Sequence, residues 1–127
     1  MWGKDREIDV LMGMTMESVK QEGNEAIRFK SDCGREFVMH HHQDCCECVT
    51  IEDINGDLGD LVGREIVMAE AVSSDKNPDD ADPETISYQD SFTWTFYKLA
   101  TTKGSVTIRW YGSSNGYYSE RVDFEEV

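Results

Sequence analysis

Apolar and polar residues alternate along two pairs of neighbouring segments, a pattern typical of strands with one buried face. The first pair is 26–30 with 35–39, and the second pair is 91–99 with 105–111. A short turn that contains glycine separates the two members of each pair. This arrangement predicts two antiparallel hairpins.

Aromatic residues are concentrated in the second pair. Trp94 and Phe96 alternate along one face of segment 91–99, and Trp110 lies on the apolar face of segment 105–111. Large aromatic side chains at such positions bury apolar area. We therefore assign Trp94, Phe96 and Trp110 to the core.

Three further segments, 10–16, 65–72 and 117–127, have the composition of strands. Four apolar residues at spacings of three and four predict one short helix. These residues are Ile51, Ile54, Leu58 and Leu61. The fold class predicted is therefore β-rich α+β, in which a bent antiparallel sheet or partial barrel of about seven strands is closed by one short helix.

A chain of 127 residues is long enough for one core and no more, so we predict a single domain over residues 1–127. Residues 1–7 are polar and are expected to fray. Residues 73–90 contain both prolines and six acidic residues, and we expect them to form a mobile acidic loop.

The chain carries 26 acidic and 12 basic residues, which gives a net charge of −14. Direct nucleic-acid binding is excluded by this balance, because phosphate contacts depend on Lys and Arg. The charge either keeps the protein in solution or presents a surface that competes with nucleic acid for a basic partner. No apolar run approaches the length of about 20 residues that spans a membrane, and the polar start lacks a signal-peptide core. We therefore expect no membrane partner and a cytoplasmic location.

All three histidines and three of the four cysteines fall within residues 40–48. Without a signal peptide, free thiols or a metal site are expected in place of disulfides, and the adjacent Cys45 and Cys46 would bridge only with strain. Imidazole and thiolate are donors that zinc prefers. Two donor sets remain open. One is His40, His42, Cys46 and Cys48 on a curled strand, and the other, which we take as the candidate zinc site, is His41, Cys45 and Cys46 in a curled loop.

The same residues give little support for catalysis. A cysteine activated by a histidine could act as a nucleophile, with Asp44 or Glu47 orienting the imidazole. However, Cys and His residues that are adjacent in sequence rarely face each other in a catalytic pair, and no oxyanion-hole signature accompanies them. A calcium loop that starts at Asp53 is rejected because Arg64 stands where the final glutamate is required. We therefore expect no enzymatic activity.

A second candidate surface is the Asn-Gly turn within residues 110–118, which is flanked by aromatic residues. Such a turn suits recognition of a base, a peptide or a protein patch, although an aromatic hairpin that supports the core has the same pattern. The candidate ligand- or partner-binding residues from both surfaces are His41, Gln43, Asp44, Glu47, Tyr111, Asn115, Tyr117 and Tyr118.

Two motifs carry a resemblance to a known family. They are His41-x-Gln43-Asp44-Cys45-Cys46-Glu47 and Trp110-Tyr111-Gly112-x-Ser114-Asn115-Gly116-Tyr117-Tyr118-Ser119. Together they resemble an uncharacterised family of small bacteriophage-encoded proteins, over about residues 10–125. The resemblance implies a viral accessory protein that acts in a bacterial cytoplasm, and it implies no assigned chemistry.

These observations predict a non-enzymatic phage accessory protein that binds and inhibits or redirects a host protein, for counter-defence or host takeover. One alternative is a protein that binds or sequesters a small, nucleotide-like ligand, with His41, Gln43 and Asp44 as polar contacts and Tyr117 or Tyr118 as stacking platforms. The other alternative is a zinc-stabilised structural module.

Overall fold

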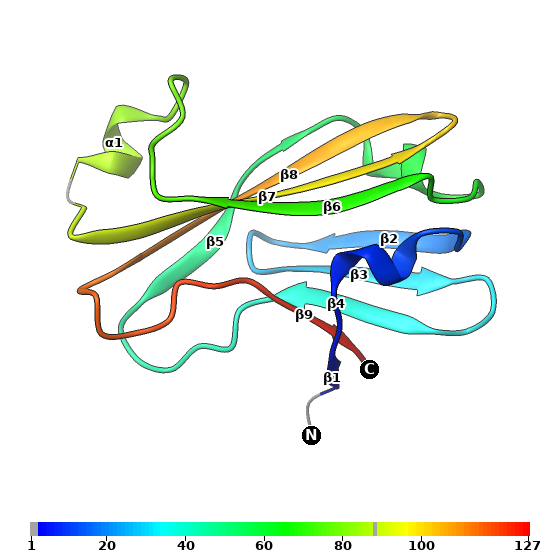
Figure 1. Ribbon diagram of the computed structural model, residues 1–127, viewed down its shortest axis with the longest axis horizontal. Helices are drawn as coiled ribbons and strands as arrows, with labels where there is room; N and C mark the ends of the chain where they lie inside the picture. The colour runs from blue at the N-terminus through cyan, green and yellow to red at the C-terminus, as the bar shows by residue number, and fades with distance from the viewer. Residues whose placement is uncertain (1–2, 88) are drawn as a thin grey trace.

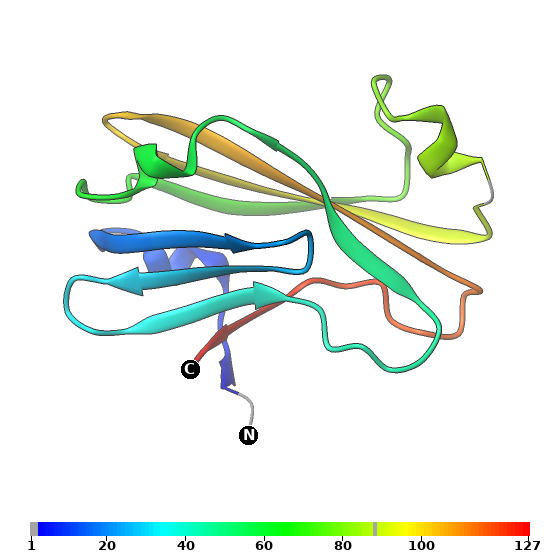
Figure 2. The ribbon, with the colours of Figure 1, turned by 180° about the vertical axis from the view of Figure 1, so that it is seen from behind.

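The computed structural model describes residues 3–87 and 89–127. In that part of the chain, nine strands form two antiparallel sheets that lie as two layers (Figures 1 and 2). One sheet has the order β1-β9-β4-β3-β2, and the other has the order β5-β8-β7-β6. The β-rich class is confirmed. The prediction of one bent sheet or partial barrel of about seven strands is wrong, because the described residues form nine strands that are divided between two separate layers.

The first sheet brings the two ends of the chain together. Its strands are β1 (Lys4–Asp5), β2 (Met16–Glu22), β3 (Ala26–Ser31), β4 (Glu36–His40) and β9 (Asp123–Glu126). Strands β3 and β4 form the first predicted hairpin. Strand β1 pairs with β9, so Lys4 and Asp5 are ordered where a frayed terminus was predicted; residues 1 and 2 lie outside the described part.

The second sheet contains the second predicted hairpin. Its strands are β5 (Cys48–Asn55), β6 (Met68–Ser74), β7 (Ser91–Thr101) and β8 (Gly104–Ser114). Strands β7 and β8 pair along their whole length, from Ser91 opposite Ser114 to Thr101 opposite Gly104. Three short helical turns complete the described fold: η1 (Ile8–Leu11), η2 (Leu58–Leu61) and α1 (Pro83–Ile86). None of the helices in the described residues has the length and apolar character needed to cross a bilayer.

The helix predicted from Ile51 to Leu61 is wrong. Ile51 and Ile54 belong to strand β5, which is irregular opposite β8 between Ile51 and Asp53. A bulge adds one residue to a strand and so brings side chains three residues apart onto one face. A spacing of three therefore arises here without a helix, and only the four residues of η2 are helical.

Other element boundaries also differ from the predictions. The region predicted as a strand over 10–16 is mostly the end of η1 and a turn, and β2 begins only at Met16. The final strand is limited to β9. Strand β6 extends to Ser74, within the segment predicted as a mobile loop over 73–90. The rest of that segment contains the single turn of α1, and residue 88 lies outside the described part.

The main core lies between the two sheets. Trp110, Leu99 and Phe37 are fully buried there, which confirms the assignment of Trp110. Trp94 is also fully buried, but it lies on the opposite face of β7, in ring contact with Tyr111 at 4.5 Å. The alternating aromatic face of β7 therefore points away from the core, and Phe96 on that face is only half-buried.

Residues 75–87 and 89–90 cover this outer face. Trp94 Nε1 donates to Asn77 Oδ1 at 2.9 Å, and Gln89 Nε2 donates to the Tyr111 hydroxyl at 2.7 Å. Arg109 connects the loop to the sheet, since its guanidinium lies 2.7 Å from Glu52 and 2.8 Å from Asp80. The acidic loop is thus fixed to the sheet through polar contacts.

We expect Gly56→Ala to destabilise the protein by about 2–3 kcal/mol. Gly56 follows β5 with a φ of +120°, and a Cβ there would lie 2.6 Å from the carbonyl oxygen of Ser105. Gly63→Ala is the matched control: its φ is +82°, nothing lies within 4 Å of the added atom, and about 1 kcal/mol is expected. Urea unfolding measures both values, and equal losses would show that β5 and β8 do not approach as closely as described.

Candidate functional site

The histidine- and cysteine-rich segment is a loop at one end of the two layers. The chain leaves the first sheet after β4 and enters the second sheet at Cys48, so residues 41–47 connect the layers. The segment 115–122, which leads into β9, runs beside this loop in both views (Figures 1 and 2). His41 joins the two segments, because its Nδ1 lies 2.7 Å from the carbonyl oxygen of Arg121.

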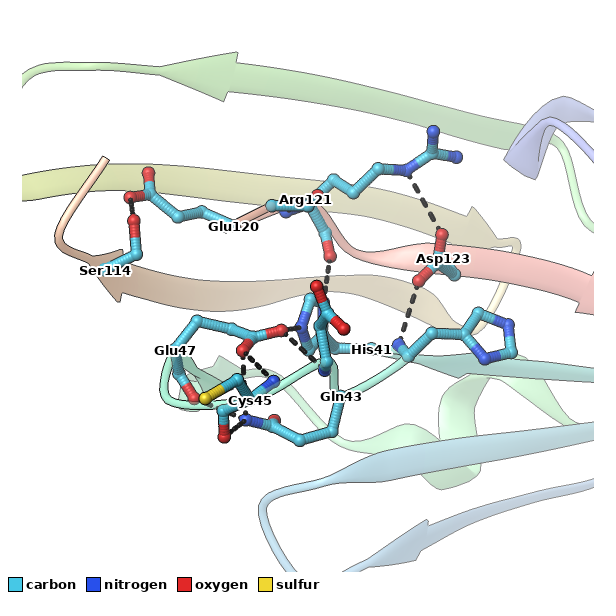
Figure 3. A network of polar contacts seen from close by, with 11 residues as sticks. His41, Gln43, Cys45, Glu47, Ser114, Glu120, Arg121 and Asp123 are labelled. Atoms are coloured by element: carbon cyan, nitrogen blue, oxygen red, sulfur yellow. Dashed lines mark hydrogen bonds and ion pairs between the residues drawn. The ribbon is translucent and has the colours of Figure 1, made fainter. Parts of the chain in front are cut away.

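The carboxylate of Glu47 organises the loop, as Figure 3 shows. Its side chain is completely buried and accepts hydrogen bonds from the backbone N–H groups of Cys45 and Asp44, each at 2.9 Å. It also accepts one from His41 Nε2 at 2.8 Å. These donors, the Cys45 N–H first among them, lower the pKa of Glu47 to about 2 although burial opposes the shift. Gln43 closes the turn by donating to the Glu47 carbonyl at 2.6 Å.

His41 is a structural connector in this arrangement. Its side chain is only 3% exposed, and its two ring nitrogens face the Arg121 carbonyl and the Glu47 carboxylate. The ring therefore links the loop to the segment 115–122 that leads into β9.

The predicted zinc ligands His41, Cys45 and Cys46 do not form a common donor set here. Cys45 and Cys46 are bonded to each other as a disulfide, contrary to the expectation of free thiols, and both nitrogens of His41 have protein partners. Cys48 is a free, exposed cysteine, as is Cys33. A zinc ion cannot use disulfide sulfurs as thiolate ligands, so these residues serve the loop's own structure.

The predicted contact residues fall into two groups. His41, Gln43 and Glu47 form the internal network of the 41–47 loop, and Tyr111 is buried beneath residues 75–90. Their side chains are therefore occupied within the protein. Gln43 is exposed although its amide is bonded within the loop. The other exposed residues are Asp44, Asn115 and Tyr117, and Tyr118 is half-buried. Tyr117 is 84% exposed as a residue, and its ring centroid lies 5.1 Å from that of Tyr118.

A further cluster on the outer face of the first sheet contains His40 and His42 from the other open donor set, but it joins them to Glu125, which was not predicted, and not to Cys46 or Cys48. His40 Nε2 and His42 Nε2 lie 2.5 and 2.7 Å from the same oxygen of Glu125, Oε1. Asp123, in register with His40, accepts a hydrogen bond from the His42 backbone N–H at 3.0 Å. In the sequence, Asp123 and Glu125 flank the apolar Phe124, but their pairing with β4 joins segments more than 80 residues apart.

A hollow of about 420 Å³ opens beside this cluster. It is lined by His42, Glu125, Asp123, Asp5 and Arg121, among others. The hollow therefore has more carboxylates than cationic groups, and its electrostatic potential favours cations over anions.

Comparisons with curated proteins and with solved structures gave no match. The family model described as a domain of unknown function, DUF7448, matches residues 9–124. This match confirms the resemblance to an uncharacterised family. Because it spans nearly the whole chain, the protein belongs to the DUF7448 family.

Proposed function

We propose that this protein is a non-enzymatic binding protein whose acidic surface occupies a basic surface of a partner protein. The phage resemblance extends the proposal to a bacteriophage accessory protein that inhibits or redirects a host factor in the bacterial cytoplasm. The observation that supports it is the acidic loop, residues 75–90, which is attached to the outer face of the β7–β8 hairpin.

The loop concentrates negative charge in solvent. Its six acidic residues are all exposed, and it contains one lysine, so its formal charge is −6 + 1 = −5. They are Asp75, Asp79, Asp80, Asp82, Glu84 and Asp90. Clustered charge of one sign accelerates encounter with an oppositely charged partner and disfavours partners of like charge.

Attachment of the loop favours binding as well. Asn77 and Gln89 exchange two amide hydrogen bonds at 2.9 and 3.0 Å across the base of the loop, and both side chains also bond to the sheet. A segment held in place before binding loses less conformational entropy when the partner arrives. The nucleotide-like alternative receives less support, because His41 and Gln43 are engaged within their own loop and the nearby hollow is acidic.

The test compares two variants that each remove three negative charges. The first carries Asp75→Asn, Asp79→Asn and Glu84→Gln, which leave the Asp80 ion pair and the Asp82 cap of α1 intact. The control carries Asp9→Asn, Glu25→Gln and Glu36→Gln, which are exposed positions outside the loop. Both are used as bait in host lysate at low and moderate salt, and cross-linking maps the contact on the bait.

We expect salt-sensitive capture of one basic partner, cross-linked to the loop and reduced at least about tenfold by the loop variant alone. Equal capture by both variants would contradict the assignment to the loop. The absence of any specific partner at either salt concentration would contradict the proposal as a whole.

A further inference from the structure

We propose that His40, His42 and Glu125 form a binding site for one divalent transition-metal ion of the zinc type. The site lies at the edge of the hollow beside β9, and its donors are two imidazole nitrogens and one carboxylate oxygen. It differs from the His41–Cys45–Cys46 set, and it does not depend on the acidic loop.

Sheet geometry brings the three donors together. His40 and His42 are two residues apart, the spacing that places side chains on one side of an extended chain. Glu125 lies on the neighbouring antiparallel strand, two residues from the partner of His40. Backbone pairing of β4 with β9 therefore sets the positions of the donors, and all three ligand atoms lie within 4.8 Å of one another.

The distances require only a small adjustment for metal binding. Ligands at about 2.0–2.1 Å from a tetrahedral zinc ion are about 3.3 Å apart. The two nitrogens now lie 2.5 and 2.7 Å from Glu125 Oε1, so the ion would widen each contact by about 0.6–0.8 Å. Both imidazole nitrogens already lie beside one carboxylate oxygen, so a single ion between the three atoms can contact all of them after this adjustment.

The surroundings match those of a metal site. Asp123 fixes the backbone of His42 through the 3.0 Å hydrogen bond, so it acts as a supporting residue behind the ligands. The Glu125 side chain is 4% exposed and that of His42 is 33% exposed, which combines a buried anionic ligand with a solvent-facing one. The adjoining hollow supplies an entry path and room for water as a fourth ligand. Two imidazoles select the zinc class over Mg²⁺ and Ca²⁺, which prefer all-oxygen sites.

The test is a Zn²⁺ titration of tag-free protein, followed by calorimetry and native mass spectrometry. The protein carries Cys33→Ser and Cys48→Ser, so that neither exposed free thiol contributes a ligand. His42→Gln and Glu125→Gln each remove one donor from the set. Glutamine retains the size and a hydrogen-bond acceptor of Glu125, and circular dichroism verifies that each variant is folded.

We expect one Zn²⁺ per chain, with affinity reduced at least about 100-fold in His42→Gln and in Glu125→Gln. Asp123→Asn should reduce it about 10-fold, as expected of a residue that only supports the ligands. The Co²⁺ complex should show the visible absorption of a four-coordinate site. Absence of stoichiometric binding, or binding of equal affinity in all variants, would overturn the proposal. Either result would leave the capture experiment on the acidic loop unaffected.

Discussion

Glu47→Gln is expected to destabilise the folded protein at pH 7 more than any substitution of an exposed acidic residue. The buried Glu47 carboxylate accepts from the backbone N–H groups of Asp44 and Cys45 and from His41. The amide of glutamine presents an NH₂ group where one carboxylate oxygen accepted, so buried donors of the loop lose their acceptors.

The loss should depend on pH in a defined direction. Folding lowers the pKa of Glu47 from 4.5 to about 2. Its stabilising contribution is therefore complete above the unfolded pKa and is lost as the pH falls from about 4.5 through about 2. Urea unfolding between pH 7 and pH 2.5 should show wild type and Glu47→Gln converging in acid. Asp44→Asn, at the exposed neighbouring position, is the control and should follow wild type throughout. A constant difference between Glu47→Gln and wild type would argue against the buried carboxylate.

Arg109→Ala is expected to cost about 2–3 kcal/mol and to release the acidic loop. The Arg109 side chain is 12% exposed, lies between Glu52 and Asp80, and stacks 5.3 Å from the Trp94 ring. Its removal leaves the Glu52 carboxylate, which is 15% exposed, without its partner. The cost lies below the value of about 3–5 kcal/mol for a fully buried pair, because Asp80 is 76% exposed.

The matched control is Arg28→Ala, which removes an exposed pair with Glu22 and should cost at most about 1 kcal/mol. Urea unfolding gives the two free energies, and limited proteolysis reports on residues 75–90. Arg109→Ala should accelerate cleavage in the loop and weaken capture of the partner without removing any loop carboxylate. Unchanged cleavage would show that Asn77 and Gln89 alone hold the loop.

Local sequence patterns were sufficient for the two hairpins. In each case the alternation of apolar residues and the glycine-containing turn act within about 25 residues, and pairing follows from the short connection. The pattern did not reveal that Trp94 and Trp110 face opposite sides of the second sheet. Both faces of β7 are covered, one by the first sheet and the other by residues 75–90, so aromatic residues occur on each.

The errors have identifiable physical causes. In β5 the irregularity between Ile51 and Asp53 produced a spacing that matches a helix. For the candidate site, the composition of residues 40–48 identified the correct part of the chain but not the roles of its members. Glu47 became the organising group because it is buried among N–H donors, and burial of a carboxylate cannot be read from spacing alone.

Glu125 could not be associated with His40 and His42 from sequence. The contact requires β9 to pair with β4 across more than 80 residues, and no short connection specifies that pairing. The geometry of neighbouring residues predicted that Cys45 and Cys46 do not form a disulfide bond with each other. In the structure they do form that disulfide bond.

Pairing of β1 with β9 makes the two ends of the chain neighbours at one edge of the first sheet (Figure 1). A short linker can therefore join the ends, and new ends can be opened at the exposed Asn115–Gly116 turn without cutting a strand. In such a circularly permuted chain, an affinity handle or fluorophore would be attached at the 115–116 turn instead of at the β1–β9 edge.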